Sequence, residues 1–287
     1  MTESLGTLLK GSLHFCKTHA RPILIASVVF GVLMFSVQKV LEVKITTSME
    51  NTFGDVEQMQ EISNRIEKGD EEAFQEMMMM MGMMGEDGEM SEERVAKAAL
   101  GLWKGMLPLF TLFFVAMILI SLISTAFYLT LAIEGSQDFM TTLRRVPSLM
   151  LPLLGVWVWS FLRSFAWIPV IGILIAVIIG PRLTLSSVIL VKEKKGVMES
   201  VKESYIRTRG YWGKIVSNGF VATLLVMIVM LILTLGVGLL GSMSMTAAAI
   251  VGSVIQSAMT AFGAIFVVRL SNTISDHPLQ PAAPVTP

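Results

Sequence analysis

Residues 22–41, PILIASVVFGVLMFSVQKVL, decide the fold class of this chain. They form a largely apolar run of about the 20 residues that a helix needs to cross the roughly 30 Å hydrocarbon core of a bilayer. Positive charges precede the run, as in a secretory signal peptide. A signal peptide, however, ends in small residues at a cleavage site, whereas this run continues into Gln38 and Lys39. We therefore predict an uncleaved membrane anchor.

Five further segments have a similar composition, although the second of the five is short. They are residues 107–133, 149–163, 167–191, 215–241 and 246–268. The whole chain agrees with them, because 53% of its residues are hydrophobic and only 15% are charged, which is too apolar for an ordinary soluble domain. We predict an all-α polytopic bundle of six transmembrane helices, with a small helical extension outside the membrane.

The distribution of charge predicts the orientation. Residues 42–104 carry fifteen acidic and six basic side chains, which makes the loop 42–106 strongly acidic. Basic residues beside spans remain in the cytoplasm. They gather in four segments, which are the N-terminus 1–21, the loop 134–148, the segment 192–214 and the proline-rich tail 269–287. The chain is thus expected to be a multi-pass protein of a prokaryotic cytoplasmic (inner) membrane, with both termini cytoplasmic.

That orientation requires a tight hairpin at residues 163–167. If 149–163 and 167–191 were one span, the most basic loop would lie outside the cell, against the charge rule. Two full spans and a re-entrant pair both satisfy the rule, and the sequence leaves the two open.

The acidic loop is predicted to contain three helices. Apolar residues recur at steps of three and four along its first part, at Phe53, Val56, Met59, Ile62 and Ile66. This first helix should end near Gly69, and a second should run from Asp70 to Gly85. A third should follow Ser91, a good N-cap, and lead into the span at 107.

The second of these helices carries the run EMMMMMGMMGEDGEM at residues 76–90. Its candidate partner- or client-binding residues are Met77, Met78, Met79, Met80, Met81, Met83 and Met84. Methionine is flexible and suits adaptable apolar contacts with a protein, a lipid or a hydrophobic client. Thioethers also select Cu(I), which Met77, Met81 and Met84 could hold, although the loop has no histidine or cysteine. The run could instead pack against the first helix or enter the outer leaflet.

A short amphipathic helix is predicted after Gly196, with Val197, Val201 and Tyr205 on one face and Gly210 at its end. We expect it to lie along the cytoplasmic membrane surface. The basic residues expected to contact lipid head groups are Lys192, Lys194, Lys195, Lys202, Arg207 and Arg209. A plain basic loop without lipid contact remains the alternative.

This stretch also carries a resemblance to a known family. The matching positions are Arg182, Gly196, Glu199, Ser204, Thr208 and Gly210, while Tyr205 stands where the family has tryptophan. The last half of the chain resembles the membrane domain of bacterial glycerophosphodiester phosphodiesterases and related six-helix inner-membrane proteins. The resemblance implies a six-helix fold, and it implies no activity for the membrane domain.

Two polar residues are expected to be buried within the bundle. Arg182 follows Gly180 and Pro181 and precedes an apolar run, although it could equally extend to the cytoplasmic surface. Gln256 lies in the middle of the last span, where its amide would bond to a neighbouring helix. Around it small residues recur every four positions in two rows, one of Ala248, Gly252, Gln256, Thr260 and Ala264, the other of Ala249, Ser253, Ser257 and Ala261. These rows predict close helix packing, either within the chain or with another subunit.

The sequence predicts no enzyme. It contains no nucleophile elbow, phosphate loop or paired intramembrane carboxylates, and its three histidines lie near the termini. We expect no cofactor and no nucleic acid partner. The prediction is a non-catalytic scaffold, assembly or accessory subunit that contacts membrane lipids and another membrane protein or complex. The alternative is a carrier of a small solute, a lipid or Cu(I).

Overall fold

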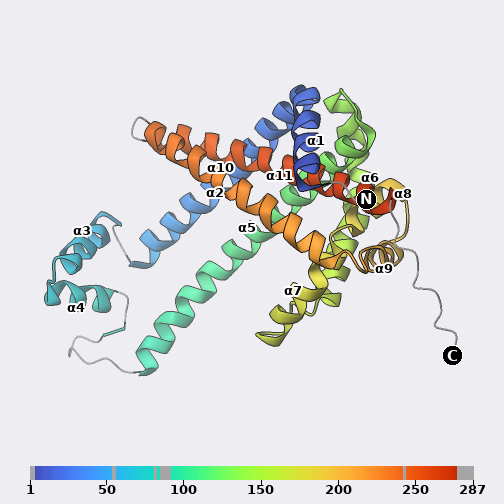
Figure 1. Cartoon of the computed structure of the whole chain (residues 1–287). Helices are drawn as coiled ribbons and strands as arrows, with labels where there is room; N and C mark the ends of the chain where they lie inside the picture. The colour runs from blue at the N-terminus through green and yellow to red at the C-terminus, as the bar shows by residue number, and fades with distance from the viewer. Residues whose placement is uncertain (1–3, 54–55, 81–82, 85–91, 242–243, 277–287) are drawn as a thin grey trace, which may run out of the picture. The chain divides into compact units, whose positions relative to one another are not determined.

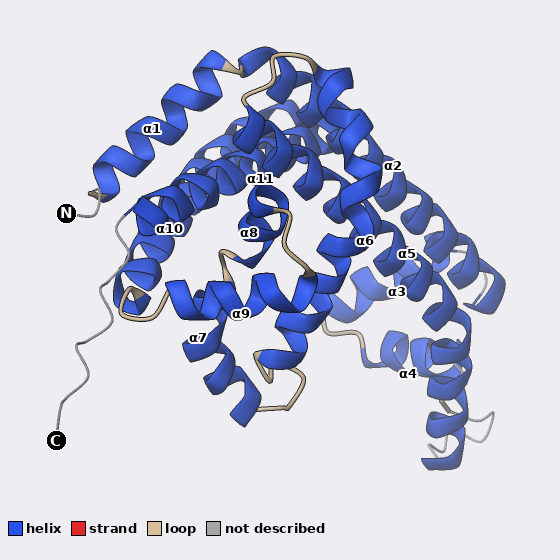
Figure 2. Cartoon of the chain, turned by 90° about the vertical axis from the view of Figure 1, so that its right-hand side faces the viewer, coloured by secondary structure: helices blue, strands red, loops and turns tan. Residues whose placement is uncertain are grey.

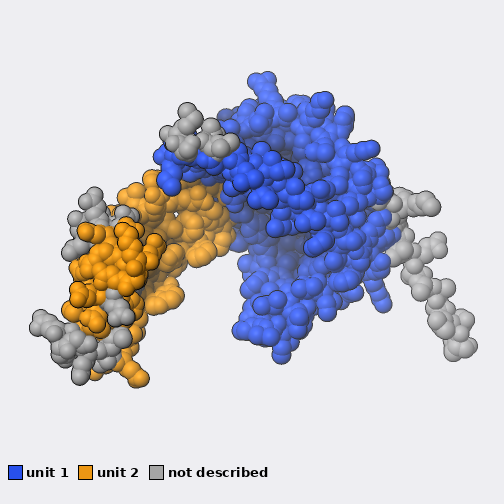
Figure 3. Space-filling view, turned by 60° about the vertical axis from the view of Figure 1, so that its left-hand side comes forward, with its two compact units in different colours: residues 1–33, 119–287 blue, residues 34–118 orange. Residues whose placement is uncertain are grey.

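The computed structural model describes residues 4–53, 56–80, 83–84, 92–241 and 244–276. These residues form eleven α-helices (Figure 1), which confirms the predicted all-α class. Residues 1–33 and 119–287 make one compact unit and residues 34–118 make a second (Figure 3), and we describe each by itself.

Unit 1 contains α1 (Leu5–Thr18), α6 (Phe139–Arg163), α7 (Ile171–Leu183), α8 (Ser186–Glu193), α9 (Val197–Arg207), α10 (Trp212–Gly241) and α11 (Met245–Asp276). Unit 2 contains α3 (Val56–Glu67) and α4 (Glu71–Met80). Two long helices contribute to both units, namely α2 (Ala20–Phe53) and α5 (Glu92–Glu134).

Six helical segments of the described residues are long and apolar enough to cross a membrane. They are Ala20–Ser48, Val95–Glu134, Phe139–Arg163, Ile171–Glu193, Trp212–Gly238 and Met245–Ser275. The chain is therefore a multi-pass membrane protein, as predicted. The segments Phe139–Arg163 and Ile171–Glu193 are each long enough to cross a membrane. The helical hairpin that they form is therefore long enough to make two full spans.

The third span was predicted to be short, and this is wrong. Asp138 caps the helix N-terminus by accepting a hydrogen bond from the Thr141 amide (2.8 Å), so α6 begins at Phe139 rather than at residue 149. The Thr141 hydroxyl also donates to this carboxylate (2.5 Å). The hydroxyl bond and, after it, the amide bond hold the pKa of Asp138 below its usual value. The predicted loop 134–148 consequently contains only a short connection after α5, and Arg144 and Arg145 are helical.

The fourth span is interrupted. α7 ends at Leu183 and α8 begins at Ser186, with Thr184 and Leu185 between them. Before α7 the chain turns through residues 164–170, where Phe165 and Val170 have positive φ and the Trp167 indole donates to the Leu162 carbonyl (3.1 Å). The predicted span 167–191 is thus two helices, the first of which starts at Ile171.

The N-terminal segment contains a helix that the sequence analysis did not identify. α1 packs along α11, and Leu8 lies in a buried cluster with Leu270 and Ile274. Nearby, His19 Nε2 lies 3.1 Å from the Gly135 carbonyl oxygen, and Lys192 donates to Asn272 (2.7 Å). The four segments predicted to share one side of the membrane are therefore joined by contacts within unit 1.

The main core of unit 1 is aromatic. Phe30 of α2 meets Phe127 and Tyr128 of α5 edge to face, with ring centroids 5.8 and 5.9 Å apart. The fully buried Tyr128 hydroxyl lies 3.3 Å from the Ser27 Oγ and 2.9 Å from the Ser257 Oγ. One side chain of α5 thus connects α2 and α11.

Gln256 is exposed, so the prediction that it is buried is wrong. α11 turns its other small row inward, and Ser253, Ser257 and Ala261 are buried. This orientation is set by the bond from Ser257 to Tyr128 and by the close approach of Val254 to Gly31. The second row closes the bundle within the chain, whereas in the row that contains Gln256 only Ala264, nearer the end of α11, is buried.

Candidate functional site

α9 packs across α8 and against α6 (Figure 2). Its inward face consists of Val201 and three buried hydroxyl residues, Ser200, Ser204 and Thr208. The helix was expected to turn its apolar face to the membrane surface. Instead that face is used inside the protein, where Val201 is buried in the main core and Val197 and Tyr205 pack against it.

The hydroxyls bind one particular carbonyl. The Arg182 carbonyl oxygen accepts from Ser204 Oγ (2.7 Å), and Thr208 Oγ1 lies 3.1 Å from it. The Thr208 hydroxyl shares its one proton between this oxygen and the closer Ser204 carbonyl oxygen (2.7 Å). Near the end of a helix such a carbonyl lacks an intrahelical partner. Ser204 and Thr208, which the family resemblance singled out, therefore stabilise the last turn of α7.

The Arg182 side chain lies beside Tyr205 of the same α9. Its Nη1 donates to the Tyr205 hydroxyl (2.9 Å), and its guanidinium carbon lies 5.0 Å from the ring centroid. Arg163, the last residue of α6, places its own guanidinium carbon 5.2 Å from the same ring. Arg182 is partly buried, which fits both of the alternatives predicted for it. The arginine at the end of α6 was not predicted to join it.

The six basic residues predicted to contact lipid fall into two groups. Arg207 pairs with Glu193 (2.9 Å from Nη2) and with Glu203 (2.7 Å), and Lys195 lies 3.3 Å from Glu193. The hydrogen bond to Glu193 raises the pKa of Arg207 above its usual value. Because carboxylates already pair with them, Arg207 and Lys195 are less available to bind a lipid head group.

The other four basic side chains are exposed. Lys194, Lys202 and Arg209 have no ion pair among the described residues, and Lys192 is bonded to Asn272. A pattern of charge along the sequence could not separate these groups, because the neutralising glutamates come from two different helices.

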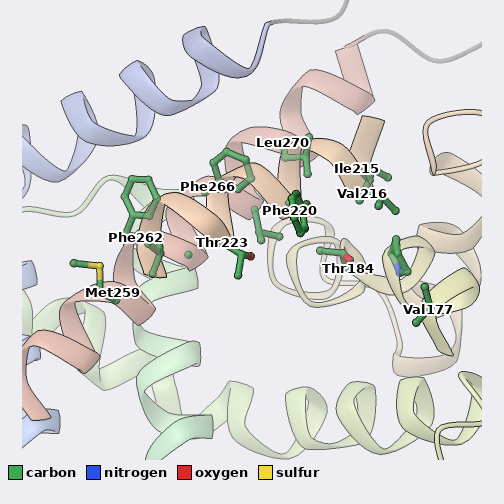
Figure 4. Close-up of a pocket in the computed structure, with 16 residues that line it drawn as sticks. Val177, Thr184, Ile215, Val216, Phe220, Thr223, Met259, Phe262, Phe266 and Leu270 are labelled. Atoms are coloured by element: carbon green, nitrogen blue, oxygen red, sulfur yellow. The ribbon is translucent and has the colours of Figure 1, made fainter. Parts of the chain in front are cut away.

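An apolar groove of about 560 Å³ lies between α7, α10 and α11. Figure 4 shows Val177, Phe220, Phe262 and Phe266 around it, with the hydroxyl-bearing Thr184 and Thr223 among them. The described residues that line the groove include no charged side chain. Phe220 and Val177 are 67% and 60% exposed, so the groove opens outward. Sequence analysis did not identify it, since its lining comes from three separate spans.

The first methionines of the run, Met77 to Met80, belong to a helical hairpin in unit 2. α3 and α4 pack together, burying Ile62 of the predicted apolar stripe and Ala73, whereas Phe53, predicted to be in the same helix as Ile62, is the last residue of α2. Arg65 pairs with Asp70 (2.9 Å) and with Glu76 (3.0 Å). The bond from Arg65 lowers the pKa of Asp70, whose other oxygen caps α4 through the amides of Glu72 and Ala73.

α4 ends at Met80. Met79 is 47% exposed and Met77, Met78 and Met80 are partly buried, as are Met83 and Met84 beyond the helix. Met81 lies outside the described residues. Of the predicted Cu(I) ligands Met77, Met81 and Met84, the structure therefore describes only Met77 and Met84. The predicted helix end near Gly85 and the cap at Ser91 also lie outside the described residues.

No protein-family model, no curated protein and no solved structure matches this chain.

Proposed function

We propose that this protein is a non-catalytic membrane protein that binds lipid in the groove between α7, α10 and α11, and that it serves as an accessory or scaffolding subunit. The observation that carries the proposal is the groove itself. Its volume of about 560 Å³ falls within the roughly 300–1,000 Å³ that is typical of ligand pockets. An uncharged, outward-opening groove suits a hydrocarbon chain rather than a polar solute.

The surroundings of the groove support the same occupant. All three helices belong to segments long and apolar enough to span a bilayer. In a bilayer, lipid acyl chains would therefore surround these helices. An acyl chain could enter the groove from the side without giving up any hydrogen bonds to water. Sequence charge and composition further favour a prokaryotic cytoplasmic membrane as the location.

Filling the groove is expected to expel the lipid. Gly219 and Gly263 line the groove, and an added Cβ at either would meet no atom within 4 Å, so leucine there occupies empty space. We expect the double variant Gly219→Leu/Gly263→Leu to retain about tenfold less lipid after detergent exchange, because a loss of about 1.4 kcal/mol already weakens binding tenfold. Native mass spectrometry counts the retained lipid.

Gly252→Leu is the matched control. Gly252 lies on α11 with the same free space around an added Cβ, but outside the groove. It should retain lipid like the wild type. Equal retention by the double variant and the wild type would contradict the proposal.

A second function, docking of a partner protein, is favoured by the exposed apolar side chains of the α3–α4 hairpin. Phe74 and Met79 are both about half exposed, which is unusual for large apolar residues outside a membrane span. We infer that this hairpin gives the protein its accessory role by contacting another membrane protein.

Replacing Met77–Met81, Met83 and Met84 by glutamine is expected to abolish co-purification of that partner in mild detergent, because glutamine removes the apolar surface while keeping side-chain length. The control carries Met140→Gln and Met198→Gln, which are exposed methionines of unit 1. Metal content is read on the same samples. Cu(I) in the wild type alone, with no partner lost, would identify a ligand set instead.

A further inference from the structure

Arg163 and Arg182 are two cations that have no carboxylate partner in the part of the chain that the structure describes. The neighbouring carboxylates of Glu193, Glu199 and Glu203 form their ion pairs with Lys195 and Arg207. None of the ion pairs among the described residues includes Arg163 or Arg182. Both guanidinium groups nevertheless lie about 5 Å from one ring, that of Tyr205. Two cations held against one ring, on segments long enough to span a membrane and with no carboxylate paired to either among the described residues, favour a bound anion.

Hydrogen-bond donors remain free at this cluster. The Arg182 Nε is buried and has no hydrogen-bond partner among the described residues. The Tyr205 hydroxyl accepts from Arg182 Nη1 and so still has its own proton to donate. The Arg163 guanidinium has a ring contact and no described hydrogen bond. Buried donors without partners are costly, which makes an acceptor group at this place favourable.

The scaffold around these donors is fixed. Arg182 is held through its carbonyl by Ser204 and Thr208. Tyr205 is carried on the helix between those two residues, and Gly155 of α6 lies against Val197 at the other end of α9. The donors are thus positioned before any ligand arrives, which lowers the entropic cost of binding.

We propose that Arg163, Arg182 and Tyr205 form a binding site for a phosphate-type anion. Guanidinium groups match phosphate oxygens with paired, charge-assisted hydrogen bonds, and a phenol hydroxyl adds a neutral donor. The anion is either the head group of a phospholipid or free phosphate. The inference does not depend on what occupies the groove, because neither arginine lines it.

The test uses the full-length protein, delipidated in detergent. Native mass spectrometry measures the Kd for dioleoyl phosphatidylglycerol and for dioleoylglycerol, which has the same chains without the phosphate. Calorimetry measures the Kd for inorganic phosphate. We expect Arg182→Gln to raise the Kd for the phosphate-bearing ligand about tenfold or more, and Tyr205→Phe to raise it less, because a charged donor contributes more than a neutral one.

Arg144→Gln is the matched control, since Arg144 is an exposed arginine of α6, the helix that also carries Arg163, and lies outside the cluster. It should leave each Kd unchanged within about twofold. Should Arg182→Gln fail to fold, Arg163→Gln provides the same test, because it keeps the bond between Arg182 and Tyr205.

The two arms distinguish the sources of the anion. An effect on phosphatidylglycerol but not on dioleoylglycerol assigns a lipid head group, and an effect on inorganic phosphate alone assigns free phosphate. If the arginine variants bind both phosphate ligands as Arg144→Gln does, the site does not exist. If the groove variants lose lipid but the arginine variants do not, the result would support the lipid groove and contradict the anion site.

Discussion

Tyr128→Ala is expected to lower the free energy of unfolding of unit 1 by about 3–5 kcal/mol, as truncation of a large buried aromatic side chain usually does. Tyr128 is completely buried, meets Phe30 and Phe127 edge to face, and joins α2 to α11 through Ser27 and Ser257. The change removes the ring from the centre of the core and leaves a cavity between three helices. Thermal unfolding in detergent, followed by circular dichroism, measures the loss.

Tyr128→Phe separates the ring from its hydroxyl. It keeps the packing and removes only the two hydrogen bonds, so we expect a loss of about 0.5–1.5 kcal/mol. If Tyr128→Ala were as mild as Tyr128→Phe, the aromatic cluster would not be the main core of unit 1.

Gly31→Ala is expected to destabilise the protein by about 1–3 kcal/mol, the usual cost of overpacking. An added Cβ at Gly31 would lie 2.6 Å from the Val254 Cα and 2.7 Å from its backbone nitrogen. Backbone atoms cannot rotate away, so α2 and α11 would have to separate. The same unfolding measurement detects the change.

Gly252→Ala provides the comparison. It lies two residues from Val254 on α11, and its added Cβ would meet nothing within 4 Å. Alanine is a better helix former than glycine by about 1 kcal/mol, so this variant should be as stable as the wild type or slightly more stable. Equal melting temperatures for the two alanine variants would contradict the close contact at Gly31.

The spans could be predicted because length and hydropathy are properties of a continuous segment. All six predicted spans have a helical counterpart, and the amphipathic helix after Gly196 is present as α9. The ends of the elements were less predictable. α6 starts ten residues early because one side chain, Asp138, caps it, and a window of mean hydropathy does not detect a cap.

Orientation about a helix axis was harder to predict than the helix itself. The two rows of small residues on α11 lie side by side, and periodicity alone does not say which one faces inward. The choice depends on Tyr128 and Gly31, which come from distant parts of the sequence. Gln256 was therefore assigned to the wrong side.

The candidate sites depend on the same long-range contacts. Arg182 could be singled out because an arginine within an apolar run is unusual. That Arg163 lies near it could not be predicted, because Tyr205 on a third helix brings the two together. The groove likewise has no signature in any one of the three spans that line it.

The bonds from Ser204 and Thr208 to the Arg182 carbonyl couple two parts of the chain mechanically. An unbroken helix resists bending through its own hydrogen bonds, whereas α7 and α8 are separate at Thr184 and Leu185. The angle between them is therefore controlled from outside the span, by a helix that follows it in the chain. Any displacement of α9 must either carry the end of α7 with it or break both bonds, so a load applied to α9 is transmitted to α7, which forms one wall of the groove.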